Sequence, residues 1–401
     1  MTYDVTAVRA HFPQLLDGAA HFDGPGGTQT PDVVADAVRS ALLSPMANRG
    51  RATAAERNAE QVVLGARAAM ADLLGGHPDG IVFGRSMTAL TYDFSRTLSQ
   101  RWRPGDEVVV TRLDHDANIR PWVQAAEAVG ATVRWVDFDP ATGELTAADV
   151  ARALSGRTVL VAVTGASNLL GTRPDLPAIT ALVRERGALT YVDGVHLTPH
   201  APVDVVTLGA DFFACSPYKF LGPHCGVLAA SPDLLAQLEP AKLLPSTDAV
   251  PERFELGTLA YEVLAGTAAA VDFLADLDPG PAQSRRERLT ASMASLEAHE
   301  GALRDDLEER LAALPGATLH GRARHRTPTL LLSLAGREPA PLSEYLGSAG
   351  VNAPAGSFYA IEASRWIGLG DAGATRIGLA PYTDASDVDR LMDALHAVAG
   401  R

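Results

Sequence analysis

The sequence contains few of the residues that build disulfide frameworks or metal sites. Its 401 residues include only two cysteines, Cys215 and Cys225, which excludes a disulfide scaffold and a paired-cysteine zinc motif. No run of about 18 uninterrupted apolar residues occurs, so a transmembrane helix is not expected. The N-terminal stretch MTYDVTAVRAHF lacks a basic segment followed by an apolar run, which argues against a secretory signal. These absences predict a cytoplasmic protein in a reducing environment.

Positive charge is also scarce. The chain has 34 Lys and Arg against 48 Asp and Glu, which gives a net charge of −14 and argues against nucleic acid or an anionic membrane as a partner. No Gly-x-Gly-x-x-Gly turn follows the first strand-like run, so a nicotinamide dinucleotide site is not predicted. The hydrophobic content of 47% and charged content of 20% are typical of a globular protein.

Seven short strand-like runs alternate with helical patterns in the first half of the chain. The runs span residues 81–84, 107–111, 131–136, 158–163, 188–193, 211–216 and 225–230. Most of them are apolar throughout, as expected of strands that are covered on both faces. Amphipathic stretches lie between them, at 118–129, 146–155 and 175–186. The alternation predicts an α/β fold with a mainly parallel seven-stranded sheet, and ligands in such sheets bind beyond the carboxyl ends of the strands.

The flanking regions predict a second, smaller domain. Helices are expected at 31–44 and 56–74, and an apolar Ala-rich stretch at 259–276 ends in DLDPGPAQ. A long charged helix at 284–313 follows, whose charges are expected to form local ion pairs on a solvated face. The strand-like runs TPTLLLSL and TRIGLA and a final helix near 384–398 complete the chain. We predict an N-terminal segment (1–20) packed near the small domain, a large domain (21–266) and a small α+β C-terminal domain (267–401).

Three polar residues stand in or directly after the strand-like runs. Lys219 in the stretch SPYKFLGP is either a structural lysine with its charge in solvent, or a Schiff-base lysine whose partly buried amine loses its proton. Asp193 either caps the next turn or pairs with the protonated ring nitrogen of a pyridine cofactor. His196 is either a buried structural histidine or a hydrogen-bond partner of that cofactor's phenolic oxygen.

Together these residues resemble a known family. Asp193-Gly194-x-His196, followed by Ser216-x-x-Lys219, is similar to the pattern of class V aminotransferases, which are fold-type I pyridoxal 5′-phosphate (PLP) enzymes. Within that family the chain most resembles the cysteine desulfurase-like group. Further similar segments occur in the same order, and the resemblance extends from about residue 22 to 395. These segments are 114–122, 166–172, 257–258 and 375–379.

The resemblance implies a cofactor, a site and a dimer. PLP would form a Schiff base with Lys219, and an amino acid substrate would place its carboxylate on Arg376, close to Tyr359. The homodimer would share its active sites, because the Gly257-Thr258 pair reaches the phosphate of the partner subunit in the family. The implied catalytic residues are Lys219, Asp193, His196 and Asp116. The implied cofactor-binding residues are Ser86, Met87, Asn168, Asp193, His196, Ser216, Tyr218, Lys219, Gly257 and Thr258, and no metal is predicted.

The phosphate site also has a physical basis, because residues 84–88 follow a strand-like run and open a helical stretch. Backbone N–H groups at a helix N-terminus attract a dianion. Ser86 is either part of that phosphate site or an ordinary helix cap.

Two positions depart from the family pattern. Residues 356–360 correspond to the loop that carries the nucleophilic cysteine in desulfurases, and they contain none. Asp116 stands where the family usually has a histidine over the cofactor ring. It either relays protons or caps the helix that starts near Asn118, with His115 or another side chain over the ring. We expect a lyase or desulfurase-like reaction on a sulfur-containing or β-substituted amino acid. An aminotransferase or epimerase is the alternative, and a non-catalytic PLP-binding protein is a remote one.

Overall fold

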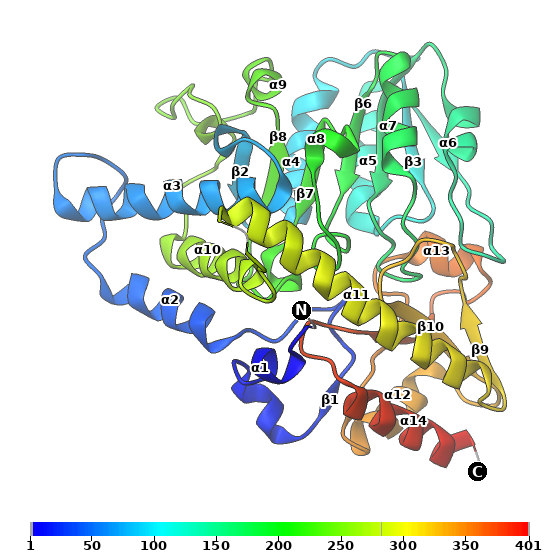
Figure 1. Cartoon of the computed structure of the whole chain (residues 1–401). Helices are drawn as coiled ribbons and strands as arrows, with labels where there is room; N and C mark the ends of the chain where they lie inside the picture. Colours follow the sequence, from blue (N-terminus) through cyan, green and yellow to red (C-terminus); the bar gives the residue numbers. More distant parts are fainter. Residues whose placement is uncertain (1–2, 282, 400–401) are drawn as a thin grey trace.

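A seven-stranded sheet forms the centre of the computed structural model, which describes residues 3–281 and 283–399 (Figure 1). Neighbouring strands are parallel except that β8 runs antiparallel to both of its neighbours. The seven predicted runs form these seven strands, and the predicted α/β fold with a mainly parallel sheet is confirmed. In spatial order the strands are β2 (Ile81–Gly84), β8 (Gly226–Ala230), β7 (Phe212–Cys215), β6 (Leu189–Asp193), β5 (Thr158–Thr164), β3 (Glu107–Thr111) and β4 (Thr132–Val136).

Both faces of this sheet are buried. Because side chains alternate along a strand, Val192 of β6 lies in one hydrophobic core and its neighbour Tyr191 in the other. Strand β4 is the exception: it lies at the edge of the sheet, and Thr132 and Arg134 are exposed. The helices of this part of the chain are α2 (Asp32–Leu43), α3 (Ala54–Leu74), α4 (Met87–Ser99), α5 (Arg120–Val129), α6 (Ala147–Ala153), α7 (Leu176–Glu185), α8 (Val205–Leu208), α9 (Pro232–Ala236) and α10 (Tyr261–Ala275).

A second sheet lies in the C-terminal part of the chain. It is antiparallel, with the order β12 (Ala355–Gly356), β13 (Ala374–Gly378), β10 (Thr329–Leu334) and β9 (Ala317–His320). Its own hydrophobic core includes residues of α12 (Pro339–Ser348) and α14 (Ala385–Ala399). Strand β1 (Ala20–His21) pairs with β11 (Val351–Asn352), so the chain contacts this part near its start as well. A short helix, α13 (Ile361–Trp366), follows β12.

Helix α11 (Arg285–Ala312) is the predicted long charged helix, and it connects the two parts of the chain (Figure 1). It begins at a capping box in which the Ser284 hydroxyl accepts from the Glu287 N–H and the Glu287 carboxylate accepts from the Ser284 N–H. It contacts α3 and α10 as well as β9 and α14. Local ion pairs such as Arg310 with Asp306 are present as expected, and Arg285 in addition pairs with Asp72 of α3 at 2.7 Å.

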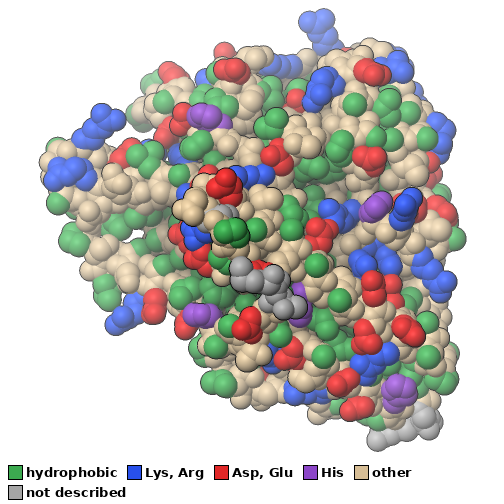
Figure 2. Space-filling view, viewed as in Figure 1, with side chains coloured by type: hydrophobic (Ala, Val, Ile, Leu, Met, Phe, Trp, Pro, Cys, Tyr) green, Lys and Arg blue, Asp and Glu red, His purple; other side chains and the backbone are tan. Residues whose placement is uncertain are grey.

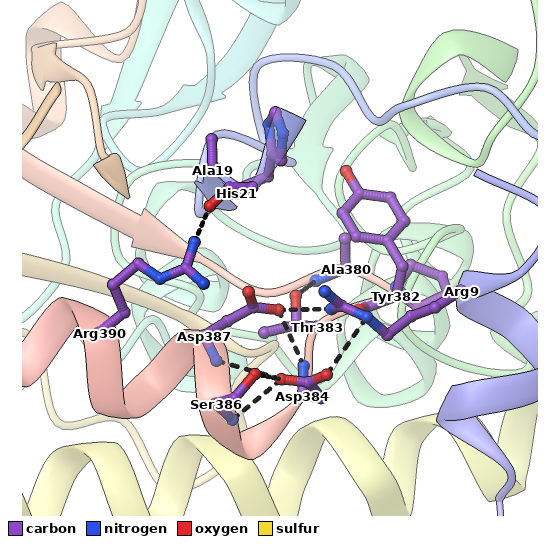
Figure 3. A network of polar contacts seen from close by, with 12 residues as sticks. Arg9, Ala19, His21, Ala380, Tyr382, Thr383, Asp384, Ser386, Asp387 and Arg390 are labelled. Atoms are coloured by element: carbon purple, nitrogen blue, oxygen red, sulfur yellow. Dashed lines mark hydrogen bonds and ion pairs between the residues drawn. The ribbon is translucent and has the colours of Figure 1, made fainter. Parts of the chain in front are cut away.

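The N-terminal helix α1 (Val5–Arg9) is tied to the first turn of α14 and the residues just before it (Figure 3). The guanidinium of Arg9 lies 2.7 Å from Asp387 and 3.2 Å from Asp384, and it donates to the carbonyl of Tyr382 at 2.6 Å. Arg390 of α14 donates to the carbonyl of Gly18. These contacts hold the first 20 residues against the C-terminal part of the chain.

The surface carries both signs of charge. Acidic and basic side chains are interspersed over the face seen in Figure 2. Within the described residues, none of the helices has the length and apolar character needed to cross a membrane.

Candidate active site

Residues at the carboxyl ends of the parallel strands surround one cavity of about 610 Å³. Asp193 is the last residue of β6, and Lys219 closes the 3₁₀ turn Pro217–Lys219 that follows β7. This is the edge at which α/β sheets bind their ligands. Ten of the predicted site residues line the cavity, namely Met87, Asp116, Asn168, Asp193, His196, Ser216, Tyr218, Lys219, Tyr359 and Arg376.

The amine of Lys219 is largely buried in this cavity. Its Nζ donates to the carbonyl of Pro25 and lies 4.9 Å from the centre of the Tyr218 ring. Burial and the nearby charge of Arg376 lower the pKa of Lys219 to about 7, against the opposing effect of Asp193. An amine with this pKa is partly neutral near pH 7, as a nucleophile or proton acceptor must be.

Asp193 caps a turn and also lines the cavity, so its predicted role toward a ring nitrogen stays a prediction. Its Oδ1 accepts a hydrogen bond from the Val195 N–H at 2.9 Å, so the carboxyl group caps the turn after β6. It also lines the cavity and is only 4% exposed. Burial raises the pKa of Asp193 to about 6, and a cation brought close to it would lower that pKa again.

Arg376 of β13 enters the cavity from the C-terminal sheet. Its Nη1 donates to the carbonyl of Asn168 at 3.0 Å, and the guanidinium lies 3.7 Å from the centre of the Phe358 ring. Its Nε is buried and has no hydrogen-bond partner within the described residues. Burial lowers the pKa of Arg376 to about 9. A guanidinium with unused donors in a cavity is suited to bind a carboxylate.

Two further residues complete the polar walls. Asn168 donates from Nδ2 to the carbonyl of Phe358 at 2.9 Å, whereas its buried Oδ1 has no hydrogen-bond partner among the described residues. The Nε2 of His196 lies 2.9 Å from the hydroxyl of Thr329. Burial, followed by the charges of His200, Arg376 and Lys219, keeps the pKa of His196 well below its usual value. The ring of His196 is therefore neutral.

The cavity fits PLP in size and in the chemistry of its donors. A volume of about 610 Å³ is ordinary for a small-molecule site. The cavity offers a partly neutral lysine, a carboxyl group suited to a ring nitrogen, and the unpaired amide oxygen of Asn168. Met87 and Thr88, at the N-terminus of α4, lie on the same cavity, where N–H groups of a helix attract a phosphate. Ser86 does cap this helix, because its hydroxyl accepts from the Ala89 N–H at 3.1 Å.

The capping interpretation of Asp116 was wrong. His115 is the residue that caps the turn Asp116–Asn118, because its Nδ1 accepts from the Ala117 N–H at 3.0 Å. The Asp116 carboxylate instead lies 2.8 Å from Nε of Arg120. Burial, opposed by Arg120 and assisted by Glu362, raises the pKa of Asp116.

His115 lines the same cavity as Asp116. Burial and the charges of Lys219 and Arg376 lower the pKa of His115 to about 4. Its ring stacks on Tyr359 with centres 5.4 Å apart. The sequence offered His115 as the alternative to Asp116 for covering a bound ring, and that role stays a prediction.

Gly257 and Thr258 do not line the Lys219 cavity. Thr258 lines a second cavity of about 740 Å³, which shares Tyr92 with the first. Their predicted role toward a partner subunit stays a prediction.

Neither cysteine belongs to the candidate site. Burial raises the pKa of the Cys215 thiol, and it raises the pKa of Cys225 to about 11. Both lie in the hydrophobic core, and no cysteine of the described chain is among the residues that line the Lys219 cavity. At the mouth of the cavity stands Tyr359, which is 75% exposed and has a left-handed φ of 60°.

The hydrogen-bond acceptor of the Lys219 amine, the carbonyl of Pro25, was not among the predicted site residues. Pro25 and Gly26 line the cavity, about 190 positions away from the lysine in the chain. The Gly- and Pro-rich stretch FDGPGG at 22–27 was a signal for a tight turn, but its position beside the lysine depends on tertiary structure.

The fold and the lysine-bearing cavity define a fold-type I enzyme. A family model described as aminotransferase class-V matches residues 20–391. The chain belongs to this family of PLP-dependent enzymes. It is 35% identical to an uncharacterised protein of Mycobacterium tuberculosis (98% of this chain, 99% of the other) and 32% identical to a Pseudomonas aeruginosa protein named "Probable cysteine desulfurase" (96% of each). The crystal structure of the cysteine desulfurase CsdA of Escherichia coli matches with a TM-score of 0.86 and 26% identity, over 99% of this chain and 98% of that one.

Proposed function

We propose that this protein is a PLP-dependent lyase that acts on a sulfur-containing or β-substituted amino acid without a protein thiol as nucleophile. The placement of the Lys219 amine carries the proposal. It lies in a cavity that Asp193 and Arg376 also line, and its pKa is about 7. The similarity to cysteine desulfurases supports a desulfurase-like reaction, and the cysteine-free wall of the described cavity favours elimination without a persulfide on the protein.

Each polar group has a definite task in this proposal. When bound, PLP withdraws electrons from the α-carbon of the substrate. Arg376 binds the α-carboxylate and orients the substrate. Lys219 holds the cofactor and, once released from it, accepts the α-proton on Nζ. Asp193 keeps the ring nitrogen protonated, and His196 is a partner for the phenolic oxygen.

Other residues hold the cofactor in place and cover it. We expect the N-terminus of α4 at Met87 to attract the phosphate, and Ser216 and Tyr218, which line the same cavity, to add hydroxyl donors. His115 covers one side of the cavity. Asp116, with its raised pKa, is placed beside Arg120 at the same wall and could move a proton to the leaving substituent.

Product analysis tests the reaction. The purified holoenzyme is incubated with cysteine, other β-substituted amino acids and, as a matched control, alanine. Formation of pyruvate and ammonia together with sulfide or the released substituent supports the proposal. A keto acid that retains the substituent, formed in an amount equal to the cofactor, indicates transamination and contradicts it. Inversion at the α-carbon without loss of the substituent indicates an epimerase and contradicts it as well.

The proposal includes a homodimer of two-domain subunits with the predicted boundaries, 21–266 and 267–401. The position of Thr258 on a cavity beside the Lys219 cavity supports a site that is completed by the partner subunit.

A further inference from the structure

A buried carboxylate meets a buried histidine behind the wall of the Lys219 cavity. Glu300 of α11 is fully buried, and its Oε2 lies 2.9 Å from Nδ1 of His200, which is 4% exposed. The other oxygen, Oε1, has no hydrogen-bond partner in the described part of the chain. Withdrawing a carboxylate from water costs several kcal/mol, and apolar residues of similar volume are often at least as stabilising. Stability alone therefore does not explain the pair.

The pair is connected to the cavity through His196. The rings of His200 and His196 meet edge to face, with centres 5.1 Å apart and planes at 72°. His196 lines the cavity, and its Nε2 is within 2.9 Å of the Thr329 hydroxyl and 3.1 Å of the Thr327 hydroxyl. The ring is thus held by hydroxyls of the C-terminal sheet region on one side and by His200 on another.

The protonation state of the His196 ring depends on the groups around it. It is kept neutral by burial and by the neighbouring positive groups, of which His200 contributes most. A neutral imidazole has one N–H and one acceptor nitrogen, so its tautomer decides what it offers to the cavity. The Glu300 carboxylate accepts from Nδ1 of His200 and so fixes the orientation of that ring, as carboxylates do behind other functional histidines.

Further titratable groups face the same carboxylate. Tyr3 donates to the carbonyl of Pro381 at 2.7 Å, and the Tyr382 hydroxyl accepts from the Gln29 N–H at 3.1 Å. Burial raises the pKa of both hydroxyls, with Glu300 adding to the effect. Both hydroxyls are therefore neutral, and His200 is the ring that lies within hydrogen-bond distance of Glu300.

We propose that Glu300 and His200 are positioning residues for the reaction: through His200, Glu300 fixes the ring orientation and the proton arrangement of His196 at the cavity wall. The inference rests on the proposed function only in that PLP occupies the Lys219 cavity. It assigns a role in the active site to a residue of α11, a helix that connects the two parts of the chain.

A pH titration of the bound cofactor tests this role without substrate. The visible absorbance of the holoenzyme is followed against pH for the unchanged protein, Glu300→Gln and His200→Gln. Glu297→Gln is the matched control, because Glu297 lies on the same helix, is 42% exposed and pairs with Arg173. We expect the titration midpoint to move by about one pH unit in both test variants, the usual spread that protein environments impose on a pKa, and to stay in place in the control. The double variant should move it no further than either single variant.

A second readout needs neither substrate nor cofactor. The nitrogen-15 shifts of the His196 ring in the cofactor-free protein report its tautomer, and we expect them to differ between Glu300→Gln and Glu297→Gln. A lowered melting temperature with an unchanged midpoint and unchanged ring shifts would show a purely structural pair and overturn the inference. If Glu300→Gln does not fold, His200→Gln decides by the same criteria. A holoenzyme that forms no elimination product contradicts the proposed function but leaves both readouts measurable.

Discussion

At the scale of single residues, the environment of Lys219 makes its amine unusually acidic. Burial and the positive charge of Arg376 disfavour the protonated form, which lowers the pKa to about 7. The amine is protonated below this pH and neutral above it. The capture rate of PLP by the cofactor-free protein should therefore rise with pH and level off above about pH 7, whereas an unperturbed lysine would level off only near about pH 10.4. Stopped-flow absorbance measures the rate.

The same experiment has a built-in control. Arg376→Gln removes a neighbouring positive charge, so the midpoint of the capture rate should move to higher pH. An identical pH profile in the two proteins would contradict the electrostatic coupling between Arg376 and Lys219.

Arg376 itself should determine how the substrate carboxylate binds. Truncating a charged hydrogen-bond donor costs about 1.5–3 kcal/mol. We expect Arg376→Gln to lower kcat/KM by about ten- to a hundredfold, mainly through KM. Arg376→Lys should recover only part of the loss, because an ammonium cannot form the two parallel bonds of a guanidinium. Steady-state kinetics with one substrate measures both variants. An unchanged KM in Arg376→Gln would show that Arg376 does not bind the substrate carboxylate.

The residues that the sequence predicted are those in or directly after strands, where local pattern and position in an α/β sheet agree. Lys219, Asp193 and Asn168 are of this kind, and the structure brings them to one cavity. Pro25 and Glu300 could not be predicted as site residues. Each matters through a contact with a residue at least 100 positions away in the chain, Lys219 for Pro25 and His200 for Glu300. In the sequence, Glu300 looks like any other acidic residue of a charged helix.

At the scale of elements, the packing of β8 on the start of α4 depends on one glycine. A Cβ at Gly226 would overlap the backbone of Ser86 and Met87, the residues that begin α4 at the phosphate end of the cavity. Gly226→Ala should force this helix start to move, at a cost of about 1–3 kcal/mol, and should weaken PLP binding. Urea unfolding and a PLP titration measure the two effects.

Gly65 provides the opposite control for this substitution. It lies on the exposed side of α3, and a Cβ there would meet nothing within 4 Å. Gly65→Ala should leave PLP binding unchanged and raise stability by about 0.5–1 kcal/mol, because alanine favours the helix. Equal PLP affinity in both variants would show that the contact of Gly226 with the backbone of Ser86 and Met87 does not affect phosphate binding.

The elements were predictable because their apolar patterns are long and their breaks are marked by Gly and Pro. All seven strands of the central sheet appear within one or two residues of the predicted runs. What the pattern could not give was the order of the strands, which places β4 at an edge with Arg134 exposed. The ion pair of Arg134 with Glu107 of the neighbouring strand β3, at 2.8 Å, likewise depends on that order.

At the scale of the whole molecule, Arg9 forms ion pairs that link the N-terminal helix to the C-terminal part of the chain (Figure 3). Arg9→Ala would leave the largely buried Asp387, 6% exposed, without its cation and should destabilise the protein by about 1–3 kcal/mol in urea unfolding. Arg365→Ala is the control, since Arg365 and Asp371 are 55% and 69% exposed and such pairs contribute about 1 kcal/mol at most. Equal losses in the two variants would mean that the network does not anchor the segment.

The proposed sharing of active sites between subunits can be tested by mixing two inactive variants. Lys219→Ala lacks the lysine, and Thr258→Ala lacks the hydroxyl that we expect to reach the partner's phosphate site. In a mixed dimer, one site combines an intact Lys219 with an intact Thr258 from the other chain, provided that the threonine acts across the interface. Refolding the two variants together should therefore restore activity, up to about half of the normal value per mixed dimer. If Thr258 acted within its own subunit, no site in the mixed dimer would be intact. Activity that stays at the level of the separate variants would place Thr258 on the same chain as the lysine it serves.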